Sequence, residues 1–171
     1  MVTRHNLVYS IAAAQRILGI KTGLYQVEEW AFVVWVRGKN FCQFVSKKLF
    51  KKHFSDRRRE EGKMIDLVID PQNDRHFTAM GGNGIYELHA NDRGVDCTCE
   101  DYKNQCRIFG SGARLCKHGY AVLGHLGFSS LSEYIERGRG SGRVDLNNVP
   151  VMLSNGARSS SQPRLRGRSV D

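Results

Sequence analysis

Four side chains that bind transition metals lie close together in the second half of the chain. Cys97 and Cys99 are separated by one residue, and Cys116 and His118 follow after a spacer of 16 residues. Three thiolates and one imidazole complete the tetrahedral ligand set that zinc prefers, and they leave no position open for a catalytic water. The spacing therefore predicts one structural Zn²⁺ held by Cys97, Cys99, Cys116 and His118.

The spacing of these four ligands has a structural reason. Cysteines at positions i and i+2 of an extended segment project to the same side, so Cys97 and Cys99 can hold one ion together. Cys116 and His118 lie where a helix is predicted to begin, and the unpaired backbone N–H groups there favour a thiolate over a thiol. Cys106, inside the spacer, is either a competing ligand or a bystander thiol.

The elements that must position the ligands are predicted on both sides of them. Alternating apolar residues on either side of a glycine-rich turn are typical of a β-hairpin, and a capping box of Ser130 and Glu133 starts a short helix. The predicted elements are a strand over 64–69, a β-hairpin over 76–80 and 85–90, an extended segment over 95–99, a polar loop over 100–115, and helices over 117–126 and 131–136.

This part of the sequence resembles the SWIM zinc finger, in which Cys-x-Cys and Cys-x-His follow a hairpin and precede a helix. The resemblance covers about residues 76–126 and assigns the four ligand positions to Cys97, Cys99, Cys116 and His118. It therefore favours Cys106 as a bystander thiol. The other matching positions are Tyr86, Leu88, Ala121, Val122 and Leu123. The family implies a ββα zinc module that binds DNA or a protein partner, and it implies no catalysis.

The N-terminal part of the sequence predicts a helix, a β-hairpin and a strongly basic helix. Residues 10–18 are rich in helix formers and are bounded by cap residues. β-Branched and aromatic residues over 30–36 and 41–45, on either side of a glycine-containing turn, predict the hairpin. Ser46 then caps a basic amphipathic helix that ends near Gly62.

Two further interpretations concern this N-terminal part. The stretch from residue 12 to residue 30 is similar to a helix-turn-helix, and the following hairpin would make it a winged version. A simple packing helix is the alternative, and we favour it because the second helix would be short, acidic and glycine-containing. Cys42 lies alone in a predicted strand, so we interpret it as a small core residue.

The charge of the chain is concentrated in two segments. The 171 residues carry 26 Lys and Arg against 17 Asp and Glu, a net charge of +9. Residues 47–63 contain eight basic and three acidic side chains, and residues 137–171 contain seven and two, whereas residues 97–136 are neutral. A basic balance favours polyanionic partners, with nucleic acid first, DNA more than RNA.

The basic helix is the candidate phosphate-contacting surface. Lysine and arginine side chains that neutralise phosphates release counterions, so binding would weaken steeply with salt. The alternative is a solvated helix face that Asp56, Glu60 and Glu61 partly neutralise. The predicted nucleic-acid contacts are Lys47, Lys48, Lys51, Lys52, Arg57, Arg58 and Arg59.

Together these elements predict an α+β protein in three parts. The N-terminal helix, β-hairpin and basic helix (1–63) pack on the zinc module (64–136), and a disordered tail rich in Arg, Gly and Ser (137–171) follows. The arginines of the tail either add affinity for a polyanion or serve solubility.

Several classes of protein are not expected. The sequence has no apolar run long enough to span a membrane, and its cysteines are too local for a secreted disulfide scaffold, which favours an intracellular protein, cytoplasmic in a prokaryote or nuclear in a eukaryote. Phosphate-binding loops and nucleophile elbows are absent from the sequence, so we expect no enzyme and no small-molecule substrate. Asp66 and Asp70, with Glu61 and Lys63 nearby, leave a metal-dependent nuclease as a remote alternative.

These observations predict a zinc-binding, nucleic-acid-binding accessory factor in transposition, recombination or regulation. The alternative is a protein-interaction adaptor in which the zinc module and the hairpin bearing Trp30 and Trp35 dock a protein partner. No membrane partner is expected.

Overall fold

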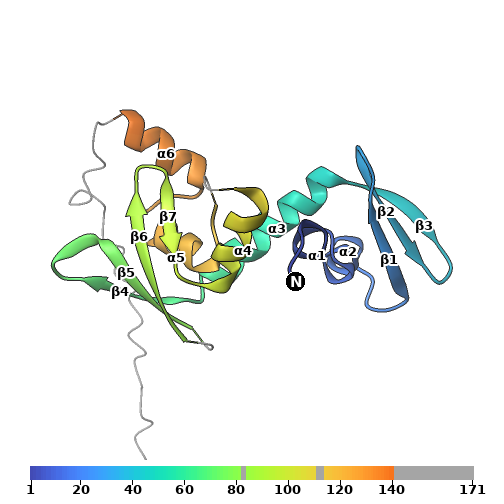
Figure 1. Ribbon diagram of the computed structural model, residues 1–171, viewed down its shortest axis with the longest axis horizontal. Coiled ribbons are helices and arrows are strands. Elements are labelled where there is room, and N and C mark those ends of the chain that lie inside the picture. The colour runs from blue at the N-terminus through green and yellow to red at the C-terminus, as the bar shows by residue number, and fades with distance from the viewer. Residues whose placement is uncertain (82–83, 111–113, 141–171) are drawn as a thin grey trace, which may run out of the picture.

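The computed structural model describes residues 1–81, 84–110 and 114–140, and these form an α+β structure with two antiparallel sheets. Figure 1 shows one sheet at each end of the molecule, with the long helix α3 (Lys47–Gly62) running between them. The predicted α+β class is confirmed. Most of the predicted tail lies outside the described residues, but its first four residues end helix α6 (Leu131–Gly140), which is longer than predicted.

The N-terminal sheet has the strand order β1-β2-β3 and packs on two short helices. Its elements are α1 (Arg4–Val8), α2 (Ile11–Leu18), β1 (Leu24–Glu29), β2 (Val33–Gly38) and β3 (Cys42–Ser46). As predicted, the Ser10 side chain caps α2 by accepting the Ala13 N–H at 3.2 Å, and Gly19 ends it with a left-handed φ of 68°. The predicted hairpin is confirmed as β2 and β3.

The favoured interpretation of residues 10–18 as a packing helix agrees with the structure, whereas the helix-turn-helix alternative and the interpretation of Cys42 are wrong. Residues 24–29 form strand β1, which pairs with β2, so the second helix of a helix-turn-helix is excluded. Gly23 precedes the strand with a left-handed φ of 85°. Leu24 and Val27 are buried against the hairpin, which favours the strand. Cys42 is exposed rather than buried, because it lies on an edge strand and is paired with Arg37 on the outward face of the sheet.

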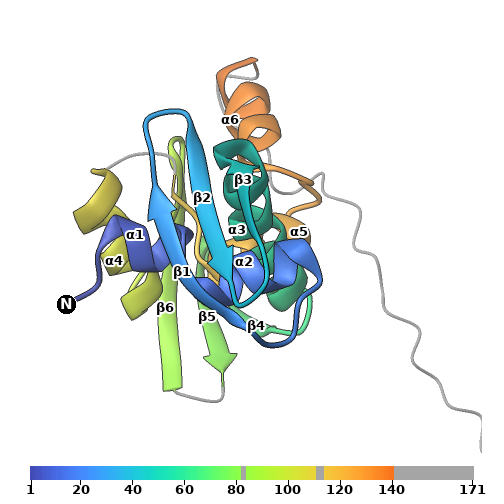
Figure 2. The same ribbon diagram turned by 90° about the vertical axis from the view of Figure 1, so that its right-hand side faces the viewer.

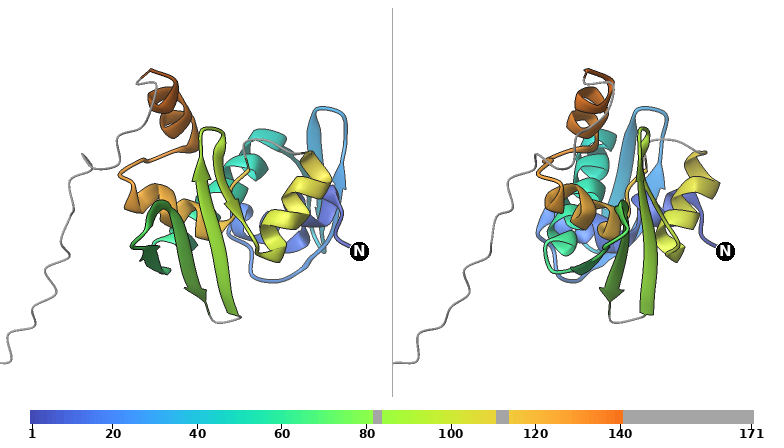
Figure 3. Two further views of the ribbon diagram at one scale, coloured as in Figure 1. Left: turned by 60° about the vertical axis from the view of Figure 1, so that its left-hand side comes forward. Right: turned by 90° about the vertical axis from the view of Figure 1, so that its left-hand side faces the viewer.

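The second sheet, β4-β5-β6-β7, carries the zinc-ligand segment at its last strand. Its strands are β4 (Asp66–Asp70), β5 (Asn73–Gly81), β6 (Gly84–Asn91) and β7 (Gly94–Cys97), and the helices that follow are α4 (Glu100–Phe109), α5 (Lys117–His125) and α6. Figure 3 shows α6 beside the β6–β7 turn, where the Tyr134 hydroxyl donates to the Asn91 carbonyl at 3.0 Å.

Helix α4 replaces the loop predicted over 100–115. The Cys99 side chain caps it, and Glu100 and Asp101 lie in its first turn, where negative charge complements the helix dipole. Its far end packs through Phe109 against Phe54 of α3, with ring centroids 6.5 Å apart. The Cys99 cap and the acidic first turn are local signals that the prediction overlooked. The contact of Phe109 with α3 stabilises the end of the helix.

Buried apolar residues form two clusters, and α3 contributes to the first of them. Phe50 of α3 lies in the first cluster, where its ring is 5.4 Å from that of Tyr9. The second cluster includes Cys97, Cys99 and Cys116 beside the fully buried Val122. The predicted ligands are therefore part of a hydrophobic core, so their chemistry and the stability of this core are linked.

Gly62, the last residue of α3, lies in close contact with the start of α5. A Cβ atom at this position would lie 2.8 Å from the Lys117 carbonyl oxygen and 3.1 Å from the Ala121 nitrogen. Alanine normally favours helix over glycine by about 1 kcal/mol, but here both obstructing atoms belong to the backbone. We expect Gly62→Ala to lower the free energy of unfolding in urea by about 1–3 kcal/mol.

Gly124 of α5 provides the matched control. It is also a helical glycine, but an added Cβ would meet nothing within 4 Å. Gly124→Ala is expected to be neutral or stabilising by up to about 1 kcal/mol. Equal stability changes in the two variants would contradict the tight contact between α3 and α5.

Candidate metal centre

Cys97, Cys99, Cys116 and His118 are brought together in one buried group. The three sulfur atoms and one imidazole nitrogen all lie within 4.8 Å of one another. His118 Nδ1 is 3.8 Å from the Cys97 sulfur and 3.9 Å from the Cys116 sulfur. A tetrahedral zinc ion with Zn–S of about 2.3 Å and Zn–N of about 2.0 Å separates such atoms by about 3.6 Å. The donor set and its size therefore fit a single structural zinc ion.

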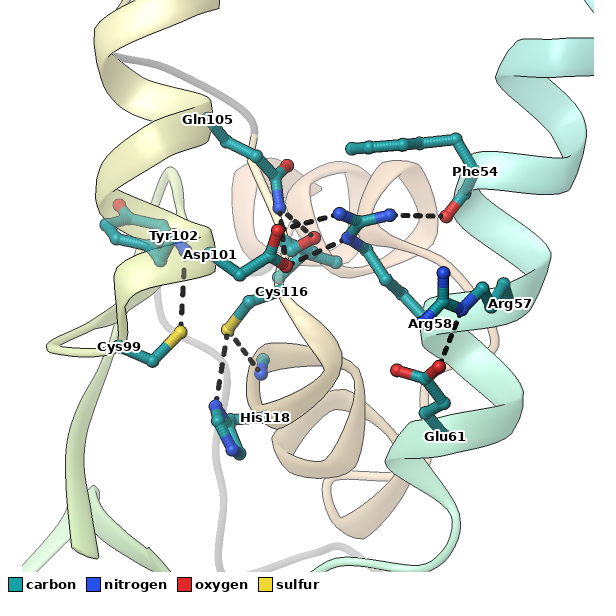
Figure 4. Close-up of polar contacts among 12 residues, drawn as sticks. Phe54, Arg57, Arg58, Glu61, Cys99, Asp101, Tyr102, Gln105, Cys116 and His118 are labelled. Atoms are coloured by element: carbon teal, nitrogen blue, oxygen red, sulfur yellow. Dashed lines mark hydrogen bonds and ion pairs between the residues drawn. The ribbon is translucent and has the colours of Figure 1, made fainter. Parts of the chain in front are cut away.

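Three separate backbone features aim the cysteines at this point. Cys97 ends β7, Cys99 caps α4 and Cys116 caps α5. The Tyr102 N–H donates to the Cys99 sulfur and the Gly119 N–H to the Cys116 sulfur, each at 3.4 Å. Backbone N–H groups at a helix start stabilise a thiolate, so both caps prepare a metal ligand (Figure 4).

The helix start at Cys116 was predicted, and the one at Cys99 was not, because α4 was predicted to be a loop. Cys106 lies on α4, half-buried, and is not part of the metal-binding group among the described residues. The interpretation of Cys106 as a bystander thiol therefore agrees with the structure.

The crowding of the three thiols shows why a cation suits this site. Contacts with Cys97 and Cys99, together with burial, raise the pKa of the Cys116 thiol, whereas contacts with Cys116 and Cys97 lower the pKa of the Cys99 thiol. Three thiolates cannot share a buried site without a positive charge, so protons remain on some of them. A divalent metal removes this conflict by stabilising all three thiolates.

His118 is held so that Nδ1 is the atom that faces the sulfurs. The side chain is 3% exposed, and the Tyr86 ring lies over it at a centroid distance of 4.5 Å. On the far side of the imidazole, a Cβ added at Gly81 would lie 3.6 Å from Nε2. The hairpin predicted before the ligands therefore fixes the orientation of the histidine ligand.

A polar network connects the starts of the two ligand-bearing helices to α3. The Arg58 guanidinium donates to both carboxylate oxygens of Asp101, at 2.7 and 2.9 Å. The Gln105 amide donates to Asp101 at 3.2 Å and to the Leu115 carbonyl at 3.1 Å. Asp101 lies two residues after Cys99 and Leu115 directly precedes Cys116, so the network supports both ligand segments (Figure 4).

This network corrects the role predicted for Arg58. Its side chain is 12% exposed, and its guanidinium lies 3.5 Å from the centroid of the Phe54 ring. Arg58 is therefore a buried structural residue and is not presented to a phosphate. Its partner, Asp101, is 43 residues away in the sequence, so no local pattern could have identified the pair.

Two other predicted phosphate contacts are partly covered by the protein. Lys47 is half-buried and donates to Glu29 at 2.7 Å. Arg59 is partly covered, with its guanidinium 5.6 Å from the Tyr120 ring and a long contact of 3.5 Å to Asp56. The structure therefore divides the seven predicted residues into an inward group, Lys47, Arg58 and Arg59, and an outward group.

The outward group is Lys48, Lys51, Lys52 and Arg57. Lys52 pairs with Asp56 and Arg57 with Glu61, both along the helix. Such exposed ion pairs are weak, so Lys52 and Arg57 can exchange their carboxylate partners for another anion. Within the described part of the chain, Lys48 and Lys51 have no carboxylate within 4.0 Å.

The carboxylates that suggested a nuclease are not assembled. An Asp70 carboxylate oxygen lies 3.7 Å from His76 Nδ1, and Glu61 forms an ion pair with Arg57. Within residues 1–81, 84–110 and 114–140, the single group of His, Cys, Asp and Glu that could hold a metal is the one at Cys97.

Comparisons with family models, curated proteins and solved structures found no match for this chain. Among the described helices, none combines the length and the apolar character needed to cross a bilayer.

Proposed function

We propose that this protein is a SWIM-type zinc protein that binds nucleic acid through the outward cations of α3. DNA is the proposed partner, in an accessory role in transposition, recombination or regulation. The observation that carries the proposal is the exposure of Lys48 and Lys51, which have no acidic partner among the described residues. They lie on a helix that packs on the first core through Phe50 and against α5 at Gly62.

The zinc ion has a structural role in this proposal. Cys97, Cys99, Cys116 and His118 fill the four positions of a tetrahedral ion, so no position remains for an activated water. The segment 97–136 is neutral overall, whereas the charge lies on α3. The metal therefore orders the core against which α3 packs, and α3 contacts the phosphates.

Charge removal on α3 tests this proposal. Lys48 and Lys51 are neighbours one helical turn apart, so both can contact one phosphate backbone. We expect Lys48→Gln with Lys51→Gln to weaken binding to a fluorescent 20-base-pair DNA about tenfold at low salt. Because each lost contact removes about 0.9 from the slope of log Kd against log salt, the slope should fall by about 2. Fluorescence anisotropy over a salt series measures both quantities.

The control variant is Lys63→Gln with Lys103→Gln, which removes the same charge from exposed lysines that pair with Glu60 and Glu100. It should leave the salt slope nearly unchanged. Equal effects of the two double variants would show that net charge, and not α3, determines binding. A wild-type Kd above micromolar at low salt would contradict nucleic-acid binding and favour the protein-interaction adaptor.

A further inference from the structure

The outer face of the sheet β1-β2-β3 carries aromatic side chains that no described element covers. Figure 2 views this sheet from outside, with α1, α2 and α3 behind it. Trp35 and Phe44 are directly opposite each other in the β2–β3 pairing, and the Trp30 ring lies 5.3 Å from the Phe44 ring. We call these three residues the aromatic platform.

The aromatic platform is not part of the protein core. Trp30 is 48% exposed and Phe44 is 58% exposed, and nearby Phe32 is 90% exposed. The apolar residues that stabilise the sheet, such as Val34, Val36 and Val45, point to the opposite face and are buried. A grouped set of exposed aromatic rings on a rigid sheet is unfavourable in water and marks a binding surface.

The charge around the aromatic platform is complementary to an anionic chain. Arg37 lies beside Trp35, with its guanidinium 5.9 Å from the ring centroid. Exposed lysines stand at both ends of the sheet, Lys39 in the β2–β3 turn and Lys48 at the start of α3. Glu28 is the single acidic residue at the outward positions of these three described strands, and it accepts the Trp30 indole N–H at 3.4 Å.

We infer that the aromatic platform binds unpaired bases of a single-stranded nucleic acid by stacking, while Arg37, Lys39 and Lys48 contact its phosphates. The inference rests on the proposed function and refines its partner. Aromatic rings stack on any exposed base, whereas a duplex keeps its base faces covered. The rings gathered on one sheet face and the cations at both of its ends suit a ligand that carries exposed bases on an anionic backbone.

The chain offers a direct readout, because its two tryptophans are Trp30 and Trp35. Titration of the zinc-loaded full chain with a 12-nucleotide oligo(dT) is expected to quench tryptophan fluorescence, and a 12-base-pair duplex should quench it much less. Phe44→Ala, which leaves both tryptophans in place, should weaken oligo(dT) binding at least about fivefold and duplex binding less than twofold.

Ile85→Ala is the matched control, because Ile85 is a 73% exposed apolar residue of the other sheet. It should bind oligo(dT) as the wild type does, and far-UV circular dichroism verifies that both variants fold. Trp35→Phe, which keeps an aromatic ring, should retain more affinity than Trp35→Ala.

The outcomes separate this inference from the proposed function. If both oligonucleotides bind with the salt dependence expected for α3 but neither Phe44→Ala nor tryptophan fluorescence responds, the aromatic platform is not a base-binding surface and the proposed function stands. If no nucleic acid binds at low salt, both fail, and the exposed rings become a surface for a protein partner.

Discussion

Cys116→Ser is expected to release the metal and to lower the free energy of unfolding by at least about 4 kcal/mol. Cys116 is fully buried and lies in the same cluster as Val122 and Leu123. Its loss leaves three ligands, and a serine hydroxyl is a poor zinc ligand at neutral pH. Because the metal binds only the folded site, its binding free energy contributes directly to folding.

Two measurements check this result. Elemental analysis of the purified wild type should give one zinc per chain, and the variant should give much less than one. Thermal unfolding followed by circular dichroism should shift strongly to lower temperature in the variant, and a chelator should shift the wild type in the same direction. The first core contains none of the four ligands, so the second core should unfold first.

Cys106→Ser is the control for this experiment. Cys106 is a half-buried thiol outside the ligand group. The variant should keep its zinc and stay within about 1 kcal/mol of the wild type. A wild type that folds cooperatively without metal, or a Cys116→Ser variant that keeps one zinc, would end the structural role proposed for the ion.

Asp101→Ala is expected to lower the free energy of unfolding by about 2–4 kcal/mol. The change removes the carboxylate that pairs with Arg58, whose side chain is 12% exposed in the wild type, and it removes an acceptor from the Gln105 amide. The pair is partly buried, with side-chain exposures of 12% and 32%, so the charge left on Arg58 would be incompletely hydrated. Urea unfolding of the zinc-loaded protein measures the effect.

Asp101 also supports the zinc ligands, so its loss should weaken zinc binding about 10–100-fold in a chelator competition. A double-mutant cycle with Arg58→Ala isolates the coupling of the pair. Lys63→Ala with Glu60→Ala is the matched control, since that pair is 62% and 65% exposed and is expected to couple by less than about 1 kcal/mol. If the coupling energy between Asp101 and Arg58 is no larger than the coupling energy of the control pair, the network is contradicted.

Local patterns determined most of the elements and the composition of the metal site. Ser10 and Gly19 mark the ends of α2, and Ser46 caps α3 at its predicted start. The four ligands can be identified from the sequence because an extended segment orients Cys97 and Cys99 and a helix start orients Cys116, each within a few residues. Such signals lie within a few residues and can be interpreted without a fold.

The tertiary structure alone decided which residues face the core and which face solvent. Residues 24–29 form a strand because the hairpin provides a partner, and Cys42 is exposed because its strand is at the edge of the sheet. Arg58 belongs to the metal-site support and not to the basic surface, because Asp101 meets it from another helix. The sequence thus determined the metal ligands and the total charge. Packing between distant segments determined which charges and which aromatic rings remain available to a partner.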